Sequence, residues 1–384
     1  MQTKLMQNSV ILSIFQRLRA TNKTGIIIVL CAASCYFHYF VTAIVLFVGL
    51  ILLLCDKQLF RDTFLHKWMI PFLPLAVMLI AVPYHYRNFK GAVAGAGIIL
   101  MVLLFLLCCK RMTISLFDLI MDVCCLASYA AFLYAFSEKL ILGWWMRSYA
   151  GMYNPNYYGT VLEFTVLICL YRIIRNHHKR LFYYATLLAC SLALFWCDSQ
   201  SAWVTIVVSV FALRILCKKK RAILLALSAC AVLVIIALSI PSIMYRIMEL
   251  PYRYDLRSYI WSGTLRAIQS YPLFGFGTMA YSVLWEPLGM YPATHAHNLY
   301  LDAFLCYGIV GVAFWMFYVV RYVKKLLKNI RTRYCYPCAL SAAALVAVSV
   351  HGLTDHTVLW IQTGFLFGIL LCGTFVKRVY RGEK

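Results

Sequence analysis

The sequence is short of charge, and of acidic residues most of all. Only 13% of its 384 residues are charged, and 13 Asp and Glu stand against 36 Lys and Arg. An average soluble domain has roughly 25% charged residues, whereas here 64% of residues are apolar and the mean hydropathy is +0.80. This shortage excludes a disordered chain, a coiled coil and a disulfide-stapled secreted module. The composition predicts an all-α, polytopic membrane protein.

Polar stretches are also few, and the longest, 241–297, contains none of the 16 cysteines. The cysteines lie almost entirely in apolar segments, where Cys acts as a small hydrophobic residue. Disulfides are therefore not expected to hold the exposed part together. Cys335 and Cys338 have thioredoxin-like spacing but no βαβ context, so no redox site is expected there.

The apolar stretches provide about twelve membrane spans, since about 20 apolar residues cross the hydrocarbon core. The predicted spans are 25–38, 39–55, 68–83, 89–109, 116–136, 156–175, 180–197, 199–217, 222–240, 298–320, 336–353 and 357–376. Residues 1–384 then form a single integral membrane domain. Residues 241–297 form a long extracytoplasmic loop between spans nine and ten, with short interfacial helices.

Charge sets the predicted topology. The stretch from Gly25 to Cys55 is long enough for one helix or for a hairpin of two. A hairpin with a cytoplasmic N-terminus places most of the 36 basic residues on cytoplasmic loops, as the positive-inside rule requires. We therefore predict that both termini are cytoplasmic and that the first span is not cleaved. Most of the net charge of +23 then lies on cytoplasmic loops, where it anchors the topology. No nucleic acid is therefore expected as a partner.

The long loop is rich in aromatic residues and contains four arginines, which are Arg246, Arg253, Arg257 and Arg266. A surface helix is predicted from Asp255 as N-cap, with Trp261, Leu265 and Ile268 on its apolar face. It ends before Tyr271, and the following Gly275 and Gly277 permit positive φ or close backbone approach. Four arginines on the outer side oppose the positive-inside bias and indicate an anionic ligand. The alternative is an interfacial helix with snorkelling arginines.

Span ten opens with a polar run, His295-Ala296-His297-Asn298, with Asp302 one turn further on. This pattern suits a His general base at His297, oriented by Asn298 or Asp302. A zinc site is less expected because no third ligand stands at suitable spacing. The alternative is an interfacial histidine with only polar contacts.

Three further acids lie within predicted spans. Glu163 lies near the outer end of span six, where an intramembrane acid is costly and marks a functional site by default. Asp118 and Asp122 are four residues apart near the cytoplasmic end of span five. A contact between helices is expected of that pair.

Three motifs together resemble the bacterial O-antigen ligase and O-antigen polymerase superfamily. They are Gly151-Met-Tyr-Asn-Pro-Asn156, then Arg257-Ser-Tyr-Ile-Trp261 followed by Tyr271-Pro-Leu-Phe-Gly-Phe-Gly277, and His297-Asn298 followed by Gly308-Ile-Val-Gly311. Each is weak alone, but their order and spacing are fairly specific. The resemblance extends over essentially the whole chain, including the long loop before the tenth span.

The resemblance implies transfer of a glycan from an undecaprenyl-pyrophosphate carrier to an acceptor hydroxyl at the outer face of the bacterial plasma membrane. The acceptor is a glycan or glycolipid, and membrane lipid surrounds the protein. Arg257 would bind the pyrophosphate, His297 would act as base, and aromatic residues of the loop such as Trp261 would stack on sugars. No cofactor or metal is expected, and transfer would be inverting. Further substrate-binding candidates are Arg253, Arg266, Gln200, Asn156, Glu163, Asn298 and Asp302.

One residue departs from the family pattern. Gln200, in Ser199-Gln200-Ser201-Ala202-Trp203, stands where the family has an arginine thought to bind the donor pyrophosphate. Either another arginine compensates, with Arg147, Arg253 and Arg266 as candidates, or the donor differs.

Alternatives remain open within and outside this enzyme class. Ligase and polymerase are not separated by the sequence, and polymerase is slightly favoured because nothing singles out a lipid-core acceptor. A peptidoglycan polymerase of the RodA type is a more distant enzyme alternative, and a non-catalytic assembly subunit is another. A transporter or flippase of lipid-linked sugars usually has internal symmetry and broken helices at the midplane, and neither is expected here.

Overall fold

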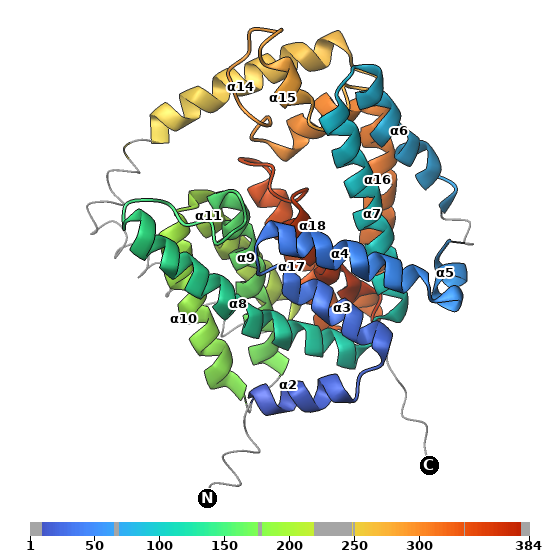
Figure 1. Ribbon diagram of the computed structural model, residues 1–384, viewed down its shortest axis with the longest axis vertical. Helices are drawn as coiled ribbons and strands as arrows, with labels where there is room; N and C mark the ends of the chain where they lie inside the picture. The colour runs from blue at the N-terminus through green and yellow to red at the C-terminus, as the bar shows by residue number, and fades with distance from the viewer. Residues whose placement is uncertain are drawn as a thin grey trace, which may run out of the picture.

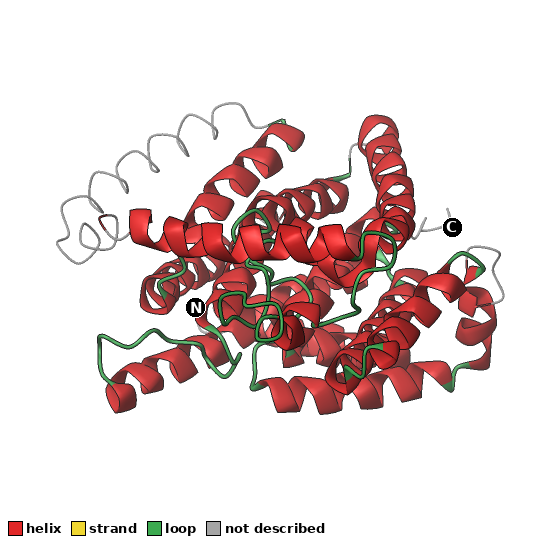
Figure 2. Cartoon of the chain, turned by 90° about the horizontal axis from the view of Figure 1, so that it is seen from above, coloured by secondary structure: helices red, strands yellow, loops and turns green. Residues whose placement is uncertain are grey.

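The computed structural model describes residues 10–64, 69–175, 179–218, 248, 250–333 and 335–377. Over these residues the protein consists of helices joined by turns and loops (Figure 1; Figure 2), with one isolated β-bridge between Thr113 and Lys377. The elements are α2 (Val10–Arg19), α3 (Lys23–Ser34), α4 (Tyr39–Leu54), α5 (Lys57–Phe64), α6 (Phe72–His85), α7 (Phe89–Arg111), α8 (Ile114–Leu142), α9 (Pro155–Arg175), α10 (Arg180–Cys197), α11 (Gln200–Leu216), α14 (Leu250–Ser270), α15 (Ala280–Leu284), α16 (Leu299–Arg333), α17 (Tyr336–His351), α18 (Ile361–Leu371) and the 3-10 helix η3 (Cys372–Thr374). The predicted all-α fold is confirmed for the described residues.

Five of the described helices are long and apolar enough to cross a membrane, namely α7, α8, α9, α10 and α16. A sixth span results if α4 and α5, which are bent by 93°, are counted together. The other apolar helices have 10–17 residues, and at 1.5 Å per residue they reach about 26 Å at most, less than the roughly 30 Å of hydrocarbon. A helix occupies every predicted span within the described residues, and the ninth, 222–240, lies outside them. The count of twelve stays a prediction.

The first apolar stretch forms two helices, as the charge argument predicted. Asn22 caps α3, because its Oδ1 accepts a hydrogen bond from the Gly25 amide at 2.8 Å. Residues between Ser34 and Tyr39 form a turn, and α4 packs back against α3.

Two buried cores hold the helices together. The larger is centred on α8, α9 and α17, and the smaller joins α6, α7, α14, α15 and α16. In Figure 1 the helices α6, α7 and α16 stand side by side, and α14 lies across one end of the molecule. The cores meet where α16 begins, since the Leu299 amide donates to the Gly352 carbonyl at 2.8 Å. This junction places the loops before α16 and after α17 next to each other.

A break in α16 defines the shape of the smaller core. Gly308 has a φ of 59° and a ψ of −173°, so the helical hydrogen bonds are interrupted there. Segment 271–277 fills the break through four backbone hydrogen bonds of 2.7–3.0 Å, donated by the amides of Ile309, Val310, Phe276 and Gly277 to the carbonyls of Pro272, Leu273, Leu305 and Cys306. A Cβ atom on Gly308 would lie 2.3 Å from the Leu273 carbonyl oxygen.

This arrangement confirms one expectation and corrects another. Gly275 and Gly277 both have positive φ. The amides of Phe276 and Gly277 donate to carbonyls of α16, so the close backbone approach that the glycines predicted is present. The expectation that the chain contains no broken helix is wrong. Sequence did not reveal the break because Gly308 fits a continuous apolar stretch, and only the docked segment makes an interruption favourable.

Helix α14 is longer than predicted and buries a different face. It begins at Leu250, so Asp255 lies inside the helix rather than at its N-cap. Leu265 is 48% exposed, while Ile260, Thr264 and Ala267 are buried. Thr264 and Ala267 have small side chains, which permit close packing of α14 against α16. Trp261 and Ile268 border this buried stripe as partly buried neighbours, as predicted for the apolar face.

A cluster of charged side chains lies at the C-terminal end of α9, and we call it the arginine–aspartate cluster. It contains Arg17, Asp118, Asp122, Arg172 and Arg175. Asp122 is fully buried and pairs with Arg17 of α2 and with Arg172, whose Nε is 2.6 Å from Asp122 Oδ1. Asp118 lies 2.9 Å from guanidinium nitrogens of both Arg172 and Arg175. The predicted contact between helices is confirmed.

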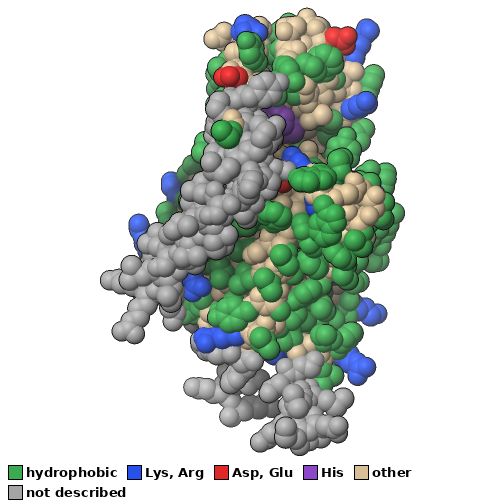
Figure 3. All heavy atoms as spheres, turned by 90° about the vertical axis from the view of Figure 1, so that its left-hand side faces the viewer, with side chains coloured by type: hydrophobic (Ala, Val, Ile, Leu, Met, Phe, Trp, Pro, Cys, Tyr) green, Lys and Arg blue, Asp and Glu red, His purple; other side chains and the backbone are tan. Residues whose placement is uncertain are grey.

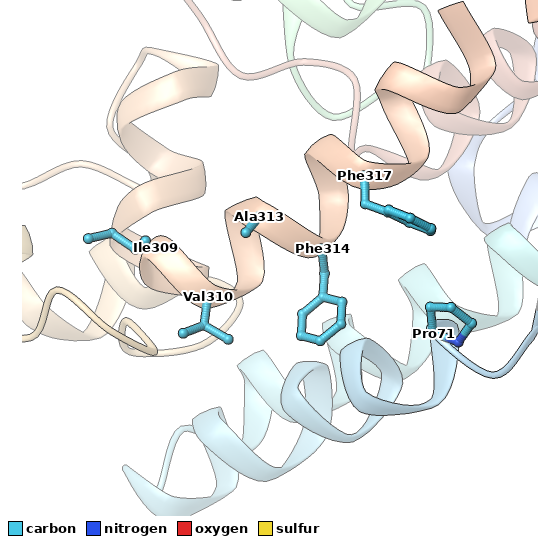
Figure 4. A pocket seen from close by; sticks show the side chains of 6 residues that line it. All are labelled: Pro71, Ile309, Val310, Ala313, Phe314 and Phe317. Atoms are coloured by element: carbon cyan, nitrogen blue, oxygen red, sulfur yellow. The ribbon is translucent and has the colours of Figure 1, made fainter. Parts of the chain in front are cut away.

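An apolar pocket of about 490 Å³ lies beside α16, close to the start of α6 (Figure 4). It is lined by Pro71, Ile309, Val310, Ala313, Phe314 and Phe317. Its lining side chains have no polar group, and none of the predicted site residues is among them. It is therefore not a candidate for acid–base chemistry.

Candidate active site

Three turns that are far apart in the sequence meet around the Asp355 carboxylate. Asp355 Oδ1 is 2.7 Å from His295 Nε2 and 3.1 Å from His297 Nδ1, and Oδ2 accepts a hydrogen bond from Asn156. The Asp355 side chain is only 2% exposed. Burial raises the pKa of Asp355, but hydrogen bonds from the two histidines outweigh it and hold the pKa well below its usual range. The carboxylate is therefore ionised.

We name this region the histidine cluster, which contains His295, His297, Asp302, Asp355 and His356. His297 is the most exposed of its three histidines, at 28%. Figure 3 shows that apolar side chains cover much of one face of the molecule and that histidine, basic and acidic groups reach the surface at only a few places. The cluster draws on the turn before α16, the first turn of α16 and the loop between α17 and α18.

His297 has the features of a general base. Its Nδ1 contact with Asp355 assigns the proton to Nδ1 and leaves the lone pair on Nε2. Within the described residues Nε2 has no hydrogen-bond partner, and the side chain is 28% exposed. The backbone φ of 46° lies in the left-handed region, which costs about 1–3 kcal/mol in a non-glycine residue and is common at functional sites. An imidazole held in this way can accept a proton from a hydroxyl.

His295 is bound more completely. Its Nε2 contacts Asp355, and its Nδ1 lies 2.8 Å from Thr294 Oγ1. Because both ring nitrogens have partners, His295 supports Asp355 and is less suited to proton transfer.

Asp302 fixes the backbone between the two histidines. Its Oδ1 accepts a hydrogen bond from the Ala296 amide at 3.1 Å, and its Oδ2 lies 2.7 Å from His356 Nδ1. Burial lowers the pKa of His356, but the Asp302 carboxylate outweighs it and raises the pKa above its usual value. His356 and Asp302 thus form a buried ion pair beside the Asp355 group.

Asn298 and Asp302 are the residues predicted to orient His297, but neither contacts its ring. Asp355 contacts the ring instead. Asn298 is instead the N-cap of α16, since its Oδ1 accepts hydrogen bonds from the amides of Tyr300 and Leu301 at 3.0 Å. Its Nδ2 donates to the Leu353 carbonyl at 3.1 Å. Asn298 therefore joins the turn before α16 to the loop that bears Asp355.

Asn156 connects Asp355 to Arg147, one of the arginines predicted to compensate for Gln200. Arg147 Nη2 donates to Asn156 Oδ1 at 2.8 Å, and Arg147 Nε donates to the Cys197 carbonyl at 3.0 Å. Asp198 lies 3.8 Å from the same guanidinium. The network thus extends from His297 through Asp355 and Asn156 to the turn between α10 and α11.

Glu163 lies in the interior of the protein and not at its surface. Its side chain is fully buried, and its Oε1 lies 2.6 Å from Nδ1 of His351, the last residue of α17. Arg257 is half-buried on α14.

The remaining predicted residues lie apart from the hydrogen-bonded network. Gln200 is the half-buried first residue of α11, Arg266 is exposed on α14, and Trp261 is partly buried in the smaller core. Arg253 belongs to α14, but its side chain is outside the described residues. The structure brings together Asn156, His297, Asn298 and Asp302, whereas Arg257 has no hydrogen bond or ion pair with them among the described residues.

The ligand atoms of His295, His297 and Asp355 lie within 4.8 Å of one another, a set that suits a divalent ion. Asp355 supplies the third ligand atom, which no residue close in sequence to the two histidines provides. Ligand atoms about 2.0–2.1 Å from a tetrahedral ion lie roughly 3.3 Å apart, whereas His295 Nε2 and Asp355 Oδ1 are 2.7 Å apart. That spacing is typical of a hydrogen bond.

Sequence reasoning assigned no site role to Asp355, His356 or His351. Asp355 and His356 were visible as a polar pair between two apolar stretches, and His351 as the histidine at the end of one of them. A polar residue in a short connection between spans is the signal that could have marked them.

Several helices are long and apolar enough to span a bilayer, which indicates a multi-pass membrane protein. The sequence model of the family described as O-antigen ligase matches residues 185–316, from α10 into α16. This match confirms the resemblance to the O-antigen ligase and polymerase superfamily, whose members are glycosyltransferase-like enzymes of bacterial surface polysaccharide assembly. No curated protein matches the chain significantly. Gln200, Arg257 and His297 lie inside the matched range, and Asn156 and Asp355 lie outside it.

Proposed function

We propose that the protein transfers a glycan from an undecaprenyl-pyrophosphate-linked donor to an acceptor hydroxyl, and that it acts as an O-antigen polymerase. The observation that supports this most is the contact between His297 Nδ1 and Asp355, which leaves Nε2 available to an acceptor. The match to the O-antigen ligase family is consistent with the same chemistry.

The reaction is a single displacement. The acceptor O–H gives its proton to His297 Nε2 while its oxygen forms a bond to the anomeric carbon. The bond between that carbon and the pyrophosphate oxygen breaks, and the electron pair leaves with the pyrophosphate. Attack opposite to the leaving group inverts the anomeric configuration, and the Asp355 carboxylate stabilises the imidazolium that forms.

The leaving group needs cations more than an acid, since pyrophosphate is stable as an anion. Arg257 binds it, and each charged hydrogen bond contributes about 1.5–3 kcal/mol. The reaction needs no metal in this scheme, so chelators should leave the rate unchanged. Arg253 and Arg266 add positive charge along α14, and Trp261 offers an aromatic surface to a sugar ring.

The buried polar residues act through the cluster. Asn156 and Asn298 hold the segments that carry His297 and Asp355, and Asp302 fixes the backbone before α16. Glu163 acts through its contact with His351 at the end of α17. Gln200 offers hydrogen bonds without charge.

The proposed topology puts both termini in the cytoplasm and the histidine cluster at the outer face. Residues 1–384 form a single membrane domain, with 241–297 as the extracytoplasmic loop. Its support is the distribution of the basic residues along the chain.

The test is to incubate the purified protein with an undecaprenyl-pyrophosphate-linked repeat unit alone and separate the products on a gel. A ladder that is lost in His297→Ala is expected. Transfer only after a separate lipid or glycan acceptor is added would identify a ligase. The break in α16 is the observation that favours a transporter, and failure of both reactions would restore that alternative.

A further inference from the structure

The histidine cluster contains three metal-ligating side chains that lie close together. The ligand atoms of His295, His297 and Asp355 are all within 4.8 Å of one another. In the part of the chain that the structure describes, no other group of three such side chains comes this close. The two contacts to Asp355 Oδ1, at 2.7 and 3.1 Å, would open by less than about 1 Å to reach the roughly 3.3 Å spacing of ligands around a tetrahedral ion.

Neighbouring side chains hold these three residues, as they usually hold the ligands of a metal site. His295 Nδ1 lies 2.8 Å from Thr294 Oγ1, a hydroxyl that can accept the ring N–H once Nε2 binds an ion. Asn156 donates to Asp355 Oδ2 and so turns Oδ1 toward both histidines. Asp355 is 2% exposed and His297 is 28% exposed. The group is therefore anchored inside the protein and open to water at His297.

The ligand set selects the kind of ion. Two imidazoles and one carboxylate are the protein ligands of known zinc sites that keep a fourth position for water. Imidazole suits Zn²⁺, whereas Mg²⁺ and Ca²⁺ prefer oxygen ligands. The three residues therefore suit zinc and not magnesium.

An ion bound to these residues would disable the proposed base. Without an ion, the contact with Asp355 puts the His297 proton on Nδ1 and leaves the lone pair on Nε2. An ion takes Nδ1, so the neutral ring must carry its proton on Nε2. No lone pair is then left for the acceptor hydroxyl, and the Asp355 charge is neutralised by the ion.

We propose that His295, His297 and Asp355 form an inhibitory zinc site, in which the ion occupies the His297 nitrogen that contacts Asp355. The inhibition rests on the proposed function, whereas the binding of zinc does not depend on it. The zinc-free protein is the active form, which agrees with a reaction that needs no metal.

The first test is to titrate the full-length protein, purified in detergent without a histidine tag, with zinc chloride in a calorimeter. Zinc should bind, and magnesium chloride should give no binding. His295→Gln and His297→Asn should each weaken zinc binding by more than about 100-fold, since the loss of a supporting partner alone costs about 10–100-fold. Thr294→Val removes only such a partner and should cost about tenfold. His85→Gln changes an exposed histidine at the end of α6, and as the matched control it should bind as wild type does.

The transfer assay tests the consequence of binding, with each variant compared with its own zinc-free rate. Zinc should inhibit the wild type and His85→Gln over the concentration range in which it binds, and excess EDTA should restore the rate. His295→Gln should need more than about 100-fold more zinc for the same fractional inhibition.

The outcomes separate this inference from the proposed function. Zinc binding that is lost in His295→Gln, in a protein without transfer activity, would support the metal site and overturn only the proposed function. An active wild type that binds no zinc would overturn the metal site alone. Equal binding or inhibition in wild type and His295→Gln would also overturn it, because the ion would then act elsewhere, such as at the exposed Cys55 or on the donor pyrophosphate.

Discussion

Two polar clusters lie at opposite ends of α9, and they satisfy buried carboxylates in different ways. In the arginine–aspartate cluster Asp122 is bound by guanidinium groups, and the Arg172 side chain is only 5% exposed. In the histidine cluster Asp355 is bound by imidazoles, and His297 is 28% exposed. Arginine stays protonated at any ordinary pH, whereas histidine changes charge near neutrality. The first cluster can therefore only hold helices together, while the second can also move a proton.

The largest effect is expected from removing the proposed base. His297→Asn keeps a residue type that tolerates positive φ but removes the ring nitrogen. Transfer should fall about 10²–10⁴-fold, the usual contribution of a general base, with little change in melting temperature. His295→Gln is the matched comparison in the same turn, and it should lose less because both His295 nitrogens already have protein partners. Equal losses in the two variants would contradict the assignment.

The opposite pattern is expected at the other end of α9. Asp122→Asn keeps the side-chain shape but leaves the charges of Arg17 and Arg172 without their shared carboxylate. Breaking a buried pair costs about 3–5 kcal/mol, so the melting temperature in detergent should fall clearly. Transfer per folded molecule should remain within about twofold of wild type. A stable but inactive Asp122→Asn protein would break the distinction between the clusters.

Asp355 tests whether the carboxylate acts on the reaction or only on the fold. Asp355→Asn retains a hydrogen-bond acceptor for one imidazole but loses the charge that stabilises the imidazolium. A misplaced or mispaired catalytic group costs about 100-fold, and the loss should appear in kcat with little change in KM for the donor. A rise in KM alone would assign Asp355 to donor binding.

The contrast between the clusters could be predicted only in part. The four-residue spacing of Asp118 and Asp122 places them on one helical face, and this local regularity is enough to expect a helix contact. His297 also stands out locally, beside Asn298 at the start of an apolar stretch. Its partner Asp355 is 58 residues away, and no local spacing reports a contact that depends on how α16 and α17 meet.

The limits of the prediction for α14 and α16 have a similar origin. Both helices exist where apolar periodicity placed them, but the buried face of α14 is set by small residues that fit α16. The break at Gly308 exists because segment 271–277 supplies replacement hydrogen bonds. Glycine spacing indicated a close backbone approach without showing which backbone would approach.

The smallest expected effect is a pH dependence of stability that distinguishes the two clusters. The raised pKa of His356 means that its ion pair with Asp302 is fully present below the unfolded imidazole pKa and is lost as the pH rises through the folded pKa. The lowered pKa of Asp355 acts in the other direction, because its contribution is lost only as the pH falls through that depressed value. In a melting series from pH 6 to 9 the contribution of Asp355 stays constant, whereas the His356 pair is lost as its imidazole loses the proton. The wild-type melting temperature should fall by about 2–4 °C more over this range than that of His356→Gln.

Asp302→Asn should show the same flattening, since it removes the partner of the same ion pair, whereas Asp122→Asn should retain the wild-type slope because its arginine partners do not titrate there. A wild-type slope in His356→Gln would mean that the pair is not charged at pH 6, and would leave the histidine cluster as a neutral hydrogen-bond network.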